Sequence, residues 1–375
     1  MSWIDVTYRI RSAPADASAV AQAIALEQSV EVPLEVIHDA FVAEHIVGRV
    51  DGVRDRGDGS HDVRIRLATE TTGFDVAQTL NMLFGNSSMH AHVEFVDAEF
   101  PTEFVAHFEG PRFGIEGIRS QLGVRGRALT CAALKPQGLP AERLAALCYA
   151  FAHAGVDVIK DDHGLADQRY APFAERVPAC QRAIERVWHE TGHRAAYAPS
   201  LVGSQSTLAE QATIARDAGA TMVLLAPALI GMPSFAELAS EHIDVPILAH
   251  PGYGGAVRVA PAFLLGKWFR LLGADAVIFP GFGGRFAWDQ RTCTAIADTA
   301  RAPWGTVRPA LPVPGGGMSV ERVRELVAFY GADSMLLIGG SLLGTPERVD
   351  ERAREFVTAV HAAASATGPV SAATS

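Results

Sequence analysis

The densest group of chemically active side chains in the sequence is Lys160-Asp161-Asp162-His163, which directly follows an apolar segment. Four ionisable groups at the end of a buried strand are costly unless each has a partner. Carboxylates are the oxygen ligands that Mg²⁺ prefers, and His163 offers either a nitrogen ligand or an acid/base. A lysine–aspartate ion pair is the simpler interpretation, but the position after a strand favours a functional site.

Three further side chains follow apolar segments and are candidates for binding an anion or moving a proton. Lys135 stands where loss of water favours proton transfer, or where the side chain serves as a fixed cation for an anionic substrate. His250 has a position that favours substrate contact over a role in the core. Arg285 lies in a glycine-rich loop, where its planar guanidinium suits a carboxylate or a phosphate. For Lys135 and Arg285 an ordinary surface position remains the alternative.

Two glycine clusters follow the last two apolar segments of the chain. Gly315-Gly316-Gly317 comes after one, and Gly339-Gly340 comes after the other. Backbone N–H groups close on phosphate oxygens only where no side chain blocks the approach. Tight turns would also explain either cluster, but both fall where β/α barrels commonly bind phosphate. We therefore expect a phosphorylated substrate, held by Gly316, Gly317, Gly339 and Gly340.

The elements that must position these residues alternate in type from about Ala128 onward, as repeated strand and helix units do. Eight units favour a closed (β/α)8 TIM barrel over an open doubly wound sheet, and no G-x-G-x-x-G motif follows the first strand. The expected helices include Ala141 to Ala154, Thr207 to Ala218, Pro261 to Leu272 and Val320 to Tyr330. The expected strands are Ala128 to Leu134, Val156 to Ile159, Ala195 to Ala198, Met222 to Ala226, Val245 to Ala249, Ala276 to Phe279, Pro309 to Val313 and Met335 to Ile338.

Residues before about Gly126 predict a smaller α+β domain of the ferredoxin-like kind. Strand-like and alanine-rich helical patterns occur there over Ile4 to Ile10, Pro14 to Leu26, His61 to Leu67 and Val93 to Phe100. The predicted fold class is therefore α/β, with an N-terminal domain at 1–125 and a catalytic barrel at 126–362. The small residues of 363–375 predict a disordered tail.

The composition indicates a large core and small-molecule partners. The chain has 375 residues, of which 49% are hydrophobic and 20% charged, with a formal net charge of −10. No run of Lys and Arg forms a nucleic-acid track or a membrane patch, and no apolar segment is long enough to span a bilayer. The four cysteines are widely spaced, unlike those of a disulfide scaffold. We expect a cytoplasmic enzyme without nucleic-acid or membrane partners.

Taken together, these motifs resemble those of the ribulose bisphosphate carboxylase (RuBisCO) large subunit, and in particular its non-carboxylating RuBisCO-like relatives. The RuBisCO metal motif Gly-x-Asp-Phe-x-Lys-x-Asp-Glu resembles Gly155 to His163, and the first-strand Lys-Pro-Lys loop resembles Lys135-Pro136-Gln137. The family's Pro-Val-x-x-Gly-Gly resembles Pro312 to Gly317, and its last glycine pair corresponds to Gly339-Gly340. The resemblance runs along nearly the whole chain.

The resemblance implies a homodimer with composite active sites. Glu27-Gln28-Ser29 and Gly85-Asn86 resemble the segments through which, in the family, Glu27 and Asn86 would reach the active site of the neighbouring subunit. The resemblance also implies Mg²⁺ bound by Asp162 and by Lys160 as a carbamate, with His163 as a third ligand. It implies an enediolate intermediate on a phosphorylated ketose or keto acid.

Four departures from the RuBisCO pattern argue against carboxylation of ribulose 1,5-bisphosphate. His163 replaces the glutamate ligand, and Gln137 stands in place of the second loop lysine. The histidine after the sixth strand is absent from Val277 to Pro280, and Arg285 replaces the lysine of the mobile loop. The change at His163 leaves open both its role as a ligand and the carbamylation of Lys160.

The Lys-Asp-Asp-His cluster and the Lys-Pro-Gln loop most resemble the branch of the family that acts on 3-oxo-isoapionate 4-phosphate. The resemblance implies a carboxy-lyase, which removes CO₂ from a phosphorylated 3-oxo sugar acid through an enediolate and leaves a tetrulose phosphate. Mg²⁺ stabilises the enediolate in this scheme. The catalytic residues would be Lys135, Lys160, His163 and His250, and the substrate would be bound by Glu27, Asn86, Arg285, Gly316, Gly317, Gly339 and Gly340.

Three alternatives stay open at this point. The first is a transcarboxylase or hydrolase acting on the same substrate. The second is an isomerase or enolase of a 5-methylthio-sugar phosphate in methionine salvage, which moves protons without releasing CO₂. The third is a sugar-phosphate-binding protein without catalysis, because a barrel can lose ligands and remain folded. Magnesium-dependent release of CO₂ would distinguish the decarboxylase from the last two.

Overall fold

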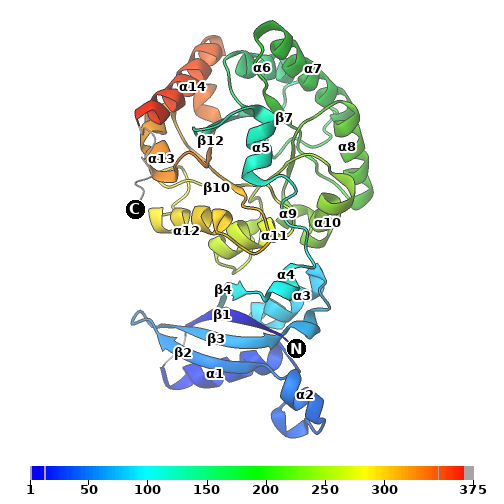
Figure 1. The fold of residues 1–375 in the computed structure, drawn as a ribbon, viewed down its shortest axis with the longest axis vertical. Helices are drawn as coiled ribbons and strands as arrows, with labels where there is room; N and C mark the ends of the chain where they lie inside the picture. The colour runs from blue at the N-terminus through cyan, green and yellow to red at the C-terminus, as the bar shows by residue number, and fades with distance from the viewer. Residues whose placement is uncertain (1, 12–13, 345, 367–375) are drawn as a thin grey trace, which may run out of the picture. The chain divides into compact units, whose positions relative to one another are not determined.

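The computed structural model describes residues 2–11, 14–344 and 346–366 and divides them into two compact units (Figure 1). The smaller unit runs up to Glu109 and includes residues 254–264 and 305–307, and the larger unit contains the rest. The division therefore precedes the boundary expected at 125/126. The reason is helix α5 (Gly114–Leu122), whose Ile115, Ile118 and Leu122 belong to the core of the larger unit.

The smaller unit is an antiparallel four-stranded sheet in the order β2-β3-β1-β4. Alternate residues of β1 are buried, which explains why its hydropathy pattern is visible in the sequence. Helix α1 packs against β2 and β3. The elements are β1 Trp3–Arg11, α1 Pro14–Glu27, α2 Ala40–His45, β2 Arg49–Asp55, β3 Ser60–Ala68, α3 Val76–Phe84, β4 Val93–Glu99 and α4 Thr102–Val105.

The larger unit is the expected parallel barrel, and all of the eight predicted strands are present. Its two ladders, β12-β5-β6-β7 and β11-β10-β9-β8, are parallel throughout. They are joined by a bridge between Ser200 and Leu224 and by contact between β11 and β12. The strands are β5 Leu129–Leu134, β6 Val158–Asp161, β7 Ala196–Ala198, β8 Val223–Leu225, β9 Ile247–Ala249, β10 Ala276–Pro280, β11 Leu311–Gly315 and β12 Met335–Ile338.

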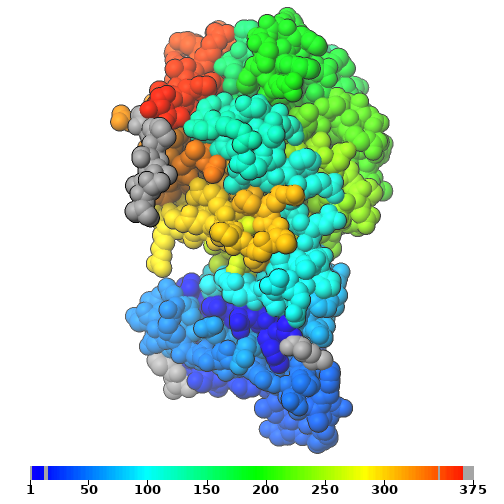
Figure 2. Space-filling model, viewed as in Figure 1, coloured from blue at the N-terminus to red at the C-terminus, as the bar shows by residue number. Residues whose placement is uncertain are grey.

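The centre of the barrel is filled by one side chain in two from each strand, as the pleat requires. Val158 of β6 belongs to this core, together with Ala133 of β5 and Ala198 of β7. In Figure 1, α5 lies across the ring of strands, and in Figure 2 its cyan side chains cover the middle of the face shown. Because α5 contributes to the same core, it closes one end of the barrel.

The outer layer consists of helices that lie against the strands. The helical segment expected over Pro261 to Leu272 is present, but Ala262–Trp268 is wound as a wider π-helix before α11 begins. The segment expected over Val320 to Tyr330 begins as a 3₁₀ turn, Val320–Arg322. The last helix extends to Ala366, so 363–366 are helical, and the rest of the expected tail lies outside the described residues. The other helices are α6 Ala141–His153, α7 Phe173–Thr191, α8 Gln205–Asp217, α9 Pro227–Ile230, α10 Met232–Glu237, α11 Phe269–Leu271, α12 Gln290–Arg301, α13 Val323–Tyr330 and α14 Val349–Ala366.

Candidate active site

The residues that follow β5 and β6 meet at the carboxylate of Asp162. Lys135 Nζ lies 2.5 Å from Asp162 Oδ1, and His163 Nδ1 lies 3.3 Å from the same oxygen. Gln137 Nε2 lies 3.4 Å from the other oxygen, Oδ2. Adjacent parallel strands end at the same edge of a barrel, and this brings the Lys-Pro-Gln loop and the Asp-His pair together. Each Asp162 oxygen therefore faces at least one donor.

Lys160 lies inside the barrel wall below Asp162. Its ladder neighbours are Ala133 and Ala198, both of which face the core. The side chain is fully buried, and its Nζ donates a hydrogen bond of 2.7 Å to the backbone oxygen of Asp161. Burial lowers the pKa of the Lys160 amine from its ordinary value, although the charges of Cys131 and Asp162 oppose the shift. The neutral amine, which is the nucleophilic form, therefore costs less to form here than at a lysine in water.

Asp162 remains ionised despite its burial. Burial alone would raise the pKa of the carboxyl group, but hydrogen bonds from His163 and Lys135 and the charge of Lys160 hold it well below its usual range. The carboxylate is therefore a permanent negative charge at the mouth of the barrel. It is suited to a cation, whether an ammonium group or a metal ion.

His250, at the end of β9, stacks on His163 with ring centroids 4.2 Å apart and planes 11° apart. The backbone N–H of Gly252 donates to His250 Nδ1 at 3.0 Å, so Nδ1 carries the lone pair and Nε2 carries the proton. Burial, together with the positive charges of Lys160 and His163, lowers the pKa of His250 to about 2. The imidazole is thus a neutral Nε2–H donor throughout the physiological range.

This burial predicts a specific pH dependence of stability. The folded-state pKa of His250 lies below the unfolded value of about 6.5, so the unfolded chain takes up the proton first as the pH falls. The stability is fully present above about pH 6.5 and is lost below it, by up to about 1.4 kcal/mol per pH unit from this group. Urea unfolding at several pH values should show a shallower acid slope for His250→Asn than for the wild type. Equal slopes would show that His250 titrates in the folded protein as it does in the unfolded chain, which would contradict the lowered pKa.

Asp161 points away from the other members of its cluster. It pairs in the ladder with Leu134 and faces the helices outside the barrel, where Arg176 Nε lies 3.1 Å from its Oδ2. Tyr197 OH donates to Oδ1 at 2.7 Å. Burial raises the pKa of the Asp161 carboxyl, which Arg176 and Tyr197 oppose. The sequence pattern treated the four ionisable residues as one group, but strand alternation separates Asp161 from Lys160 and Asp162. Arg176 and Tyr197 carried no signal in the sequence.

The glycine loops after β11 and β12 leave backbone donors open. In the described part of the chain, no hydrogen bond uses the N–H groups of Gly316, Gly317 or Gly339. The two loops lie together, because Ser341 Oγ donates to the backbone oxygen of Met318 at 2.9 Å. Lys135 is also close, since a Cβ added at Gly339 would lie 3.6 Å from its Cε. Open amides beside a cation form the kind of surface that binds a phosphate group.

The position of Arg285 is set by its backbone. Its N–H donates to the oxygen of Gly316 at 2.9 Å, which fastens the loop after β10 to the first glycine loop. The side chain is exposed, and its guanidinium lies 5.2 Å from the ring of Phe286. No described contact joins the guanidinium to Asp162 or His163, so the structure brings the Arg285 backbone, but not its charge, to the cluster.

Gly317 predicts a test of phosphate binding. Its φ is +101°, and an added Cβ would lie 2.6 Å from the backbone nitrogen of Arg285. Gly317→Ala should therefore displace the loop and raise KM for a phosphorylated substrate by about tenfold or more, as loss of a charged hydrogen bond does. Gly331→Ala is the control, because its φ of +78° imposes similar strain with no atom near the added Cβ. A KM equal to that of the control would contradict phosphate binding by this loop.

Glu27 and Asn86 lie together in the smaller unit. Asn86 Nδ2 donates to Glu27 Oε1 at 2.8 Å and to Glu31 Oε1 at 3.2 Å. Gln28 holds the neighbourhood in place, because its Oε1 accepts from the N–H of Ser87 at 3.0 Å. The structure thus brings the two segments together within one unit, with Asn86 exposed and Glu27 half-buried. Their expected reach into the active site of a neighbouring subunit stays a prediction.

The donor set at the strand ends fits a divalent cation if Lys160 contributes a ligand. Asp162 supplies oxygen and His163 supplies nitrogen, within 3.3 Å of each other. Among the described residues, the one group of three acidic or histidine side chains close enough to share an ion is elsewhere, at the exposed Glu237, Glu241 and His242. A carbamate on the buried Lys160 amine would add the third ligand that the pair lacks.

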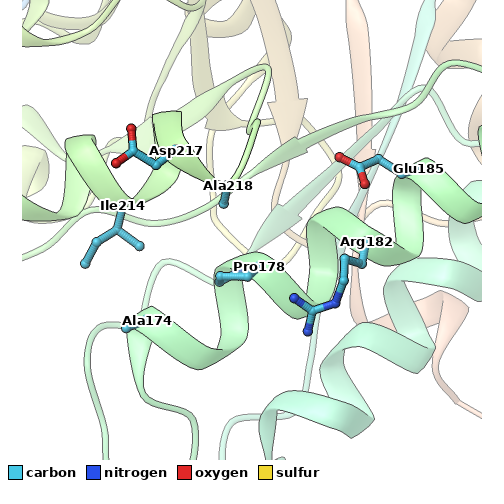
Figure 3. Close-up of a pocket in the computed structure, with 7 residues that line it drawn as sticks. All are labelled: Ala174, Pro178, Arg182, Glu185, Ile214, Asp217 and Ala218. Atoms are coloured by element: carbon cyan, nitrogen blue, oxygen red, sulfur yellow. The ribbon is translucent and has the colours of Figure 1, made fainter.

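A separate hollow of about 490 Å³ lies between α7 and α8 (Figure 3). Arg182 and Glu185 line it from α7, and Ile214 and Asp217 line it from α8. Its charged side chains have mixed signs and are exposed, and none of its lining residues belongs to the strand ends. We therefore place the active site at Asp162 and not in this groove.

The parallel barrel, the open glycine amides and the ionisable side chains around Asp162 define a TIM-barrel protein with a candidate active site at its strand ends. The chain belongs to the RuBisCO large-chain family, because residues 114–374 match the ribulose bisphosphate carboxylase large chain, catalytic domain. It is 48% identical over 95% of its length to ribulose bisphosphate carboxylase-like protein 1 of Rhodopseudomonas palustris, of which 97% is covered. It is 46% identical to the 5-methylthioribulose-1-phosphate isomerase of Rhodospirillum rubrum, over 96% of each chain.

A crystal structure confirms the fold. The Rubisco-like protein from Rhodopseudomonas palustris superposes with a TM-score of 0.90 at 43% identity, covering 96% of this chain and 98% of that one. The expected RuBisCO-like family is therefore confirmed, and so is the barrel behind a smaller sheet domain. Neither the carboxylase-like protein 1 of Rhodopseudomonas palustris nor the isomerase of Rhodospirillum rubrum is described as a decarboxylase. The isomerase matches the methionine-salvage alternative rather than the expected decarboxylation. Within the described residues, no helix combines the length and apolarity needed to cross a membrane.

Proposed function

We propose that this protein isomerises a phosphorylated methylthio-pentulose, of the 5-methylthioribulose 1-phosphate type, by moving a proton through an enediolate. The observation that carries the proposal is the cluster at Asp162, where a lysine, a neutral histidine N–H stacked on His163 and open glycine amides lie at the same end of the parallel strands. The isomerase of Rhodospirillum rubrum, at 46% identity over nearly the whole chain, supports this substrate class.

The reaction begins with loss of a proton from the carbon next to the ketone, which leaves negative charge on an enediolate oxygen. His250 Nε2–H would donate to that oxygen without itself changing charge, since its pKa is held to about 2. Lys135 would exchange the proton with the substrate carbon, because its amine lies 2.5 Å from Asp162 Oδ1 and its side chain is partly exposed at the strand end. Gly316, Gly317, Gly339 and Gly340 would bind the phosphate, and Arg285 would approach an anionic group of the substrate.

Mg²⁺ fits this scheme. It would be held by Asp162, by His163 and by Lys160 as a carbamate, and when bound it supplies positive charge beside the developing oxyanion. Burial of Lys160 favours the neutral amine that forms a carbamate with CO₂. Asp162 stays ionised and is the permanent anchor of this set.

Decarboxylation of a phosphorylated 3-oxo sugar acid would leave the same enediolate as proton removal does. The expectation of that reaction depended on Gln137 and His163, and the structure shows both side chains at Asp162. Both side chains contact Asp162, and neither forms a binding site specific to the carboxylate that decarboxylation would remove. We therefore rank proton transfer first, with carboxy-lyase, transcarboxylase or hydrolase activity as the second candidate.

The deciding experiment is incubation of the protein and Mg²⁺ with 5-methylthioribulose 1-phosphate and, separately, with 3-oxo-isoapionate 4-phosphate. A new pentulose phosphate seen by ³¹P NMR, without CO₂, is the predicted result with the first substrate. Release of CO₂ and a tetrulose phosphate from the second would establish the decarboxylase instead. Binding of either compound without conversion would leave a sugar-phosphate-binding protein.

We also propose that the active form is a homodimer in which Glu27 and Asn86 complete the site of the other copy. Glu27→Gln and Lys160→Met would each be inactive alone, but a mixed dimer would contain one intact site. Mixing the two variants after partial dissociation should therefore restore up to about a quarter of the wild-type activity, since half of the dimers are mixed and each has one site of two. No recovery in a dimer shown to be mixed would argue for sites within one chain.

A further inference from the structure

The strand that carries Lys160 and Asp162 also carries a fully buried carboxylate on its outer face. Asp161 accepts from Arg176 Nε at 3.1 Å, from Tyr197 OH at 2.7 Å and from the N–H of Ser200 at 3.1 Å. Arg176 comes from α7, while Tyr197 and Ser200 come from β7 and the residues after it. The side chains of Asp161, Arg176 and Tyr197 are fully excluded from solvent.

Stability alone does not explain this arrangement. A buried ion pair loses so much hydration that apolar side chains of similar volume often give an equally stable protein. Three donors on two different elements do, however, restrict the position of a carboxylate much more tightly than packing does. The feature that is fixed in this way is the last residue of β6.

The backbone of Asp161 connects this restraint to the candidate active site. Its carbonyl oxygen accepts the Lys160 amine at 2.7 Å, and Asp162 is the next residue in the chain. A shift of residue 161 therefore moves the amine and the Asp162 carboxylate together. Outer contacts of this kind orient metal ligands in other proteins, and their loss typically costs about 10- to 100-fold in metal affinity.

We propose that Asp161 is a positioning residue, which acts from outside the barrel wall, with Arg176 and Tyr197, to fix the metal-binding pair Lys160 and Asp162. The inference rests on the proposed function, because the site that it positions is the site of that reaction. Asp161 itself touches neither substrate nor metal in this scheme.

The residue just before the same strand offers a matched control. Asp157 is also fully buried and also paired with an arginine, since both of its oxygens lie 2.7 Å from the guanidinium of Arg127. It also accepts from the N–H and the hydroxyl of Thr130, each at 2.8 Å. Asp157→Asn therefore repeats the loss of a buried charge, four positions earlier in the chain and away from Lys160 and Asp162.

The test compares Asp161→Asn with Asp157→Asn by calorimetric titration of Mn²⁺ and by steady-state kinetics. We expect Asp161→Asn to lower Mn²⁺ affinity by about tenfold or more and kcat by a similar factor, with a smaller change in KM. Asp157→Asn should lower the melting temperature to a comparable extent while keeping Mn²⁺ affinity and kcat within about twofold of the wild type. Tyr197→Phe, which removes one of the three bonds without changing a charge, should give a smaller loss in the same direction.

Equal losses of Mn²⁺ affinity in the two aspartate variants, or wild-type affinity in Asp161→Asn, would overturn the proposal. If the wild type takes up no Mn²⁺, the metal-dependent part of the proposed function fails. Positioning by Asp161 can then still be tested with crystal structures of the two variants. In Asp161→Asn the Lys160 amine should then leave the carbonyl of residue 161, whereas in Asp157→Asn it should stay. An amine that stays in both variants would exclude positioning by Asp161.

Discussion

Lys160→Met is expected to reduce kcat/KM for the methylthio-pentulose phosphate by about three orders of magnitude or more while the protein stays folded. The methionine fills nearly the same volume inside the barrel but offers no amine for a metal ligand. The fold should tolerate the change, because the substitution removes a charge whose burial already lowers the pKa of the amine. Steady-state kinetics, with circular dichroism and thermal melting as the check on folding, measure both effects.

Lys267→Met is the control for this variant. The chain contains three lysines, and Lys267 lies in the outer segment Ala262–Trp268 and not at a strand end. Its replacement should leave kcat/KM close to the wild-type value. Full activity in Lys160→Met would remove Lys160 from the reaction and with it the carbamate.

Lys135→Met is expected to lower kcat by about two to four orders of magnitude, which is the usual contribution of a group that transfers a proton. The reason is the position of its amine, 2.5 Å from Asp162 Oδ1 and next to the open glycine loop at Gly339. The same change removes a positive charge from Asp162, so Mn²⁺ affinity should stay the same or rise. Steady-state kinetics should therefore show a fall in kcat, while calorimetric titration shows no fall in Mn²⁺ affinity.

This combination distinguishes Lys135 from a structural residue. If Lys135 merely held Asp162 in place, its removal would weaken metal binding along with turnover. A parallel fall of kcat and Mn²⁺ affinity would therefore contradict a role in proton transfer. The same Lys267→Met protein serves as the control.

The barrel could be predicted from the sequence because each strand is buried on both faces and reads as a short apolar segment. All eight predicted segments overlap the strands β5 to β12. In the smaller unit, β1 and β3 could be predicted from their alternation of apolar and polar residues. Strand β2 could not, because Arg49–Asp55 is largely exposed and carries charged side chains. The π-helical turn at Ala262–Trp268 is a tertiary feature, since Gly266 approaches the backbone of α12 at Ile296.

The candidate site could be predicted in part for a related reason. Residues that follow the parallel strands of a barrel lie at one end of it, so the placing of Lys135, Asp162 and His250 at the same end followed from the βα pattern. The direction of each side chain did not follow, because a shift of one residue in strand register exchanges the inner and outer faces. Asp161 was for this reason grouped with Asp162, and its partners on α7 and β7 were not identified.

The reaction itself was the least predictable part. The proposed enediolate chemistry uses a cation, a carboxylate and a neutral N–H donor. Lys135 lies at Asp162, and His250 stacks on the neighbouring His163. Whether the enediolate forms by loss of CO₂ or of a proton depends on the substrate, and no residue of the cluster specifies it. The relatives favour proton transfer over the decarboxylation expected from the motifs alone.

The most direct test of the proposed function is exchange of the substrate proton next to the ketone, followed by ¹H NMR in D₂O with Mg²⁺. The wild type should replace that proton of 5-methylthioribulose 1-phosphate by deuterium, whereas Asp162→Asn and metal-free protein should exchange it at least about a hundredfold more slowly. Exchange at the wild-type rate in Asp162→Asn would show that the strand-end carboxylate takes no part in forming the enediolate.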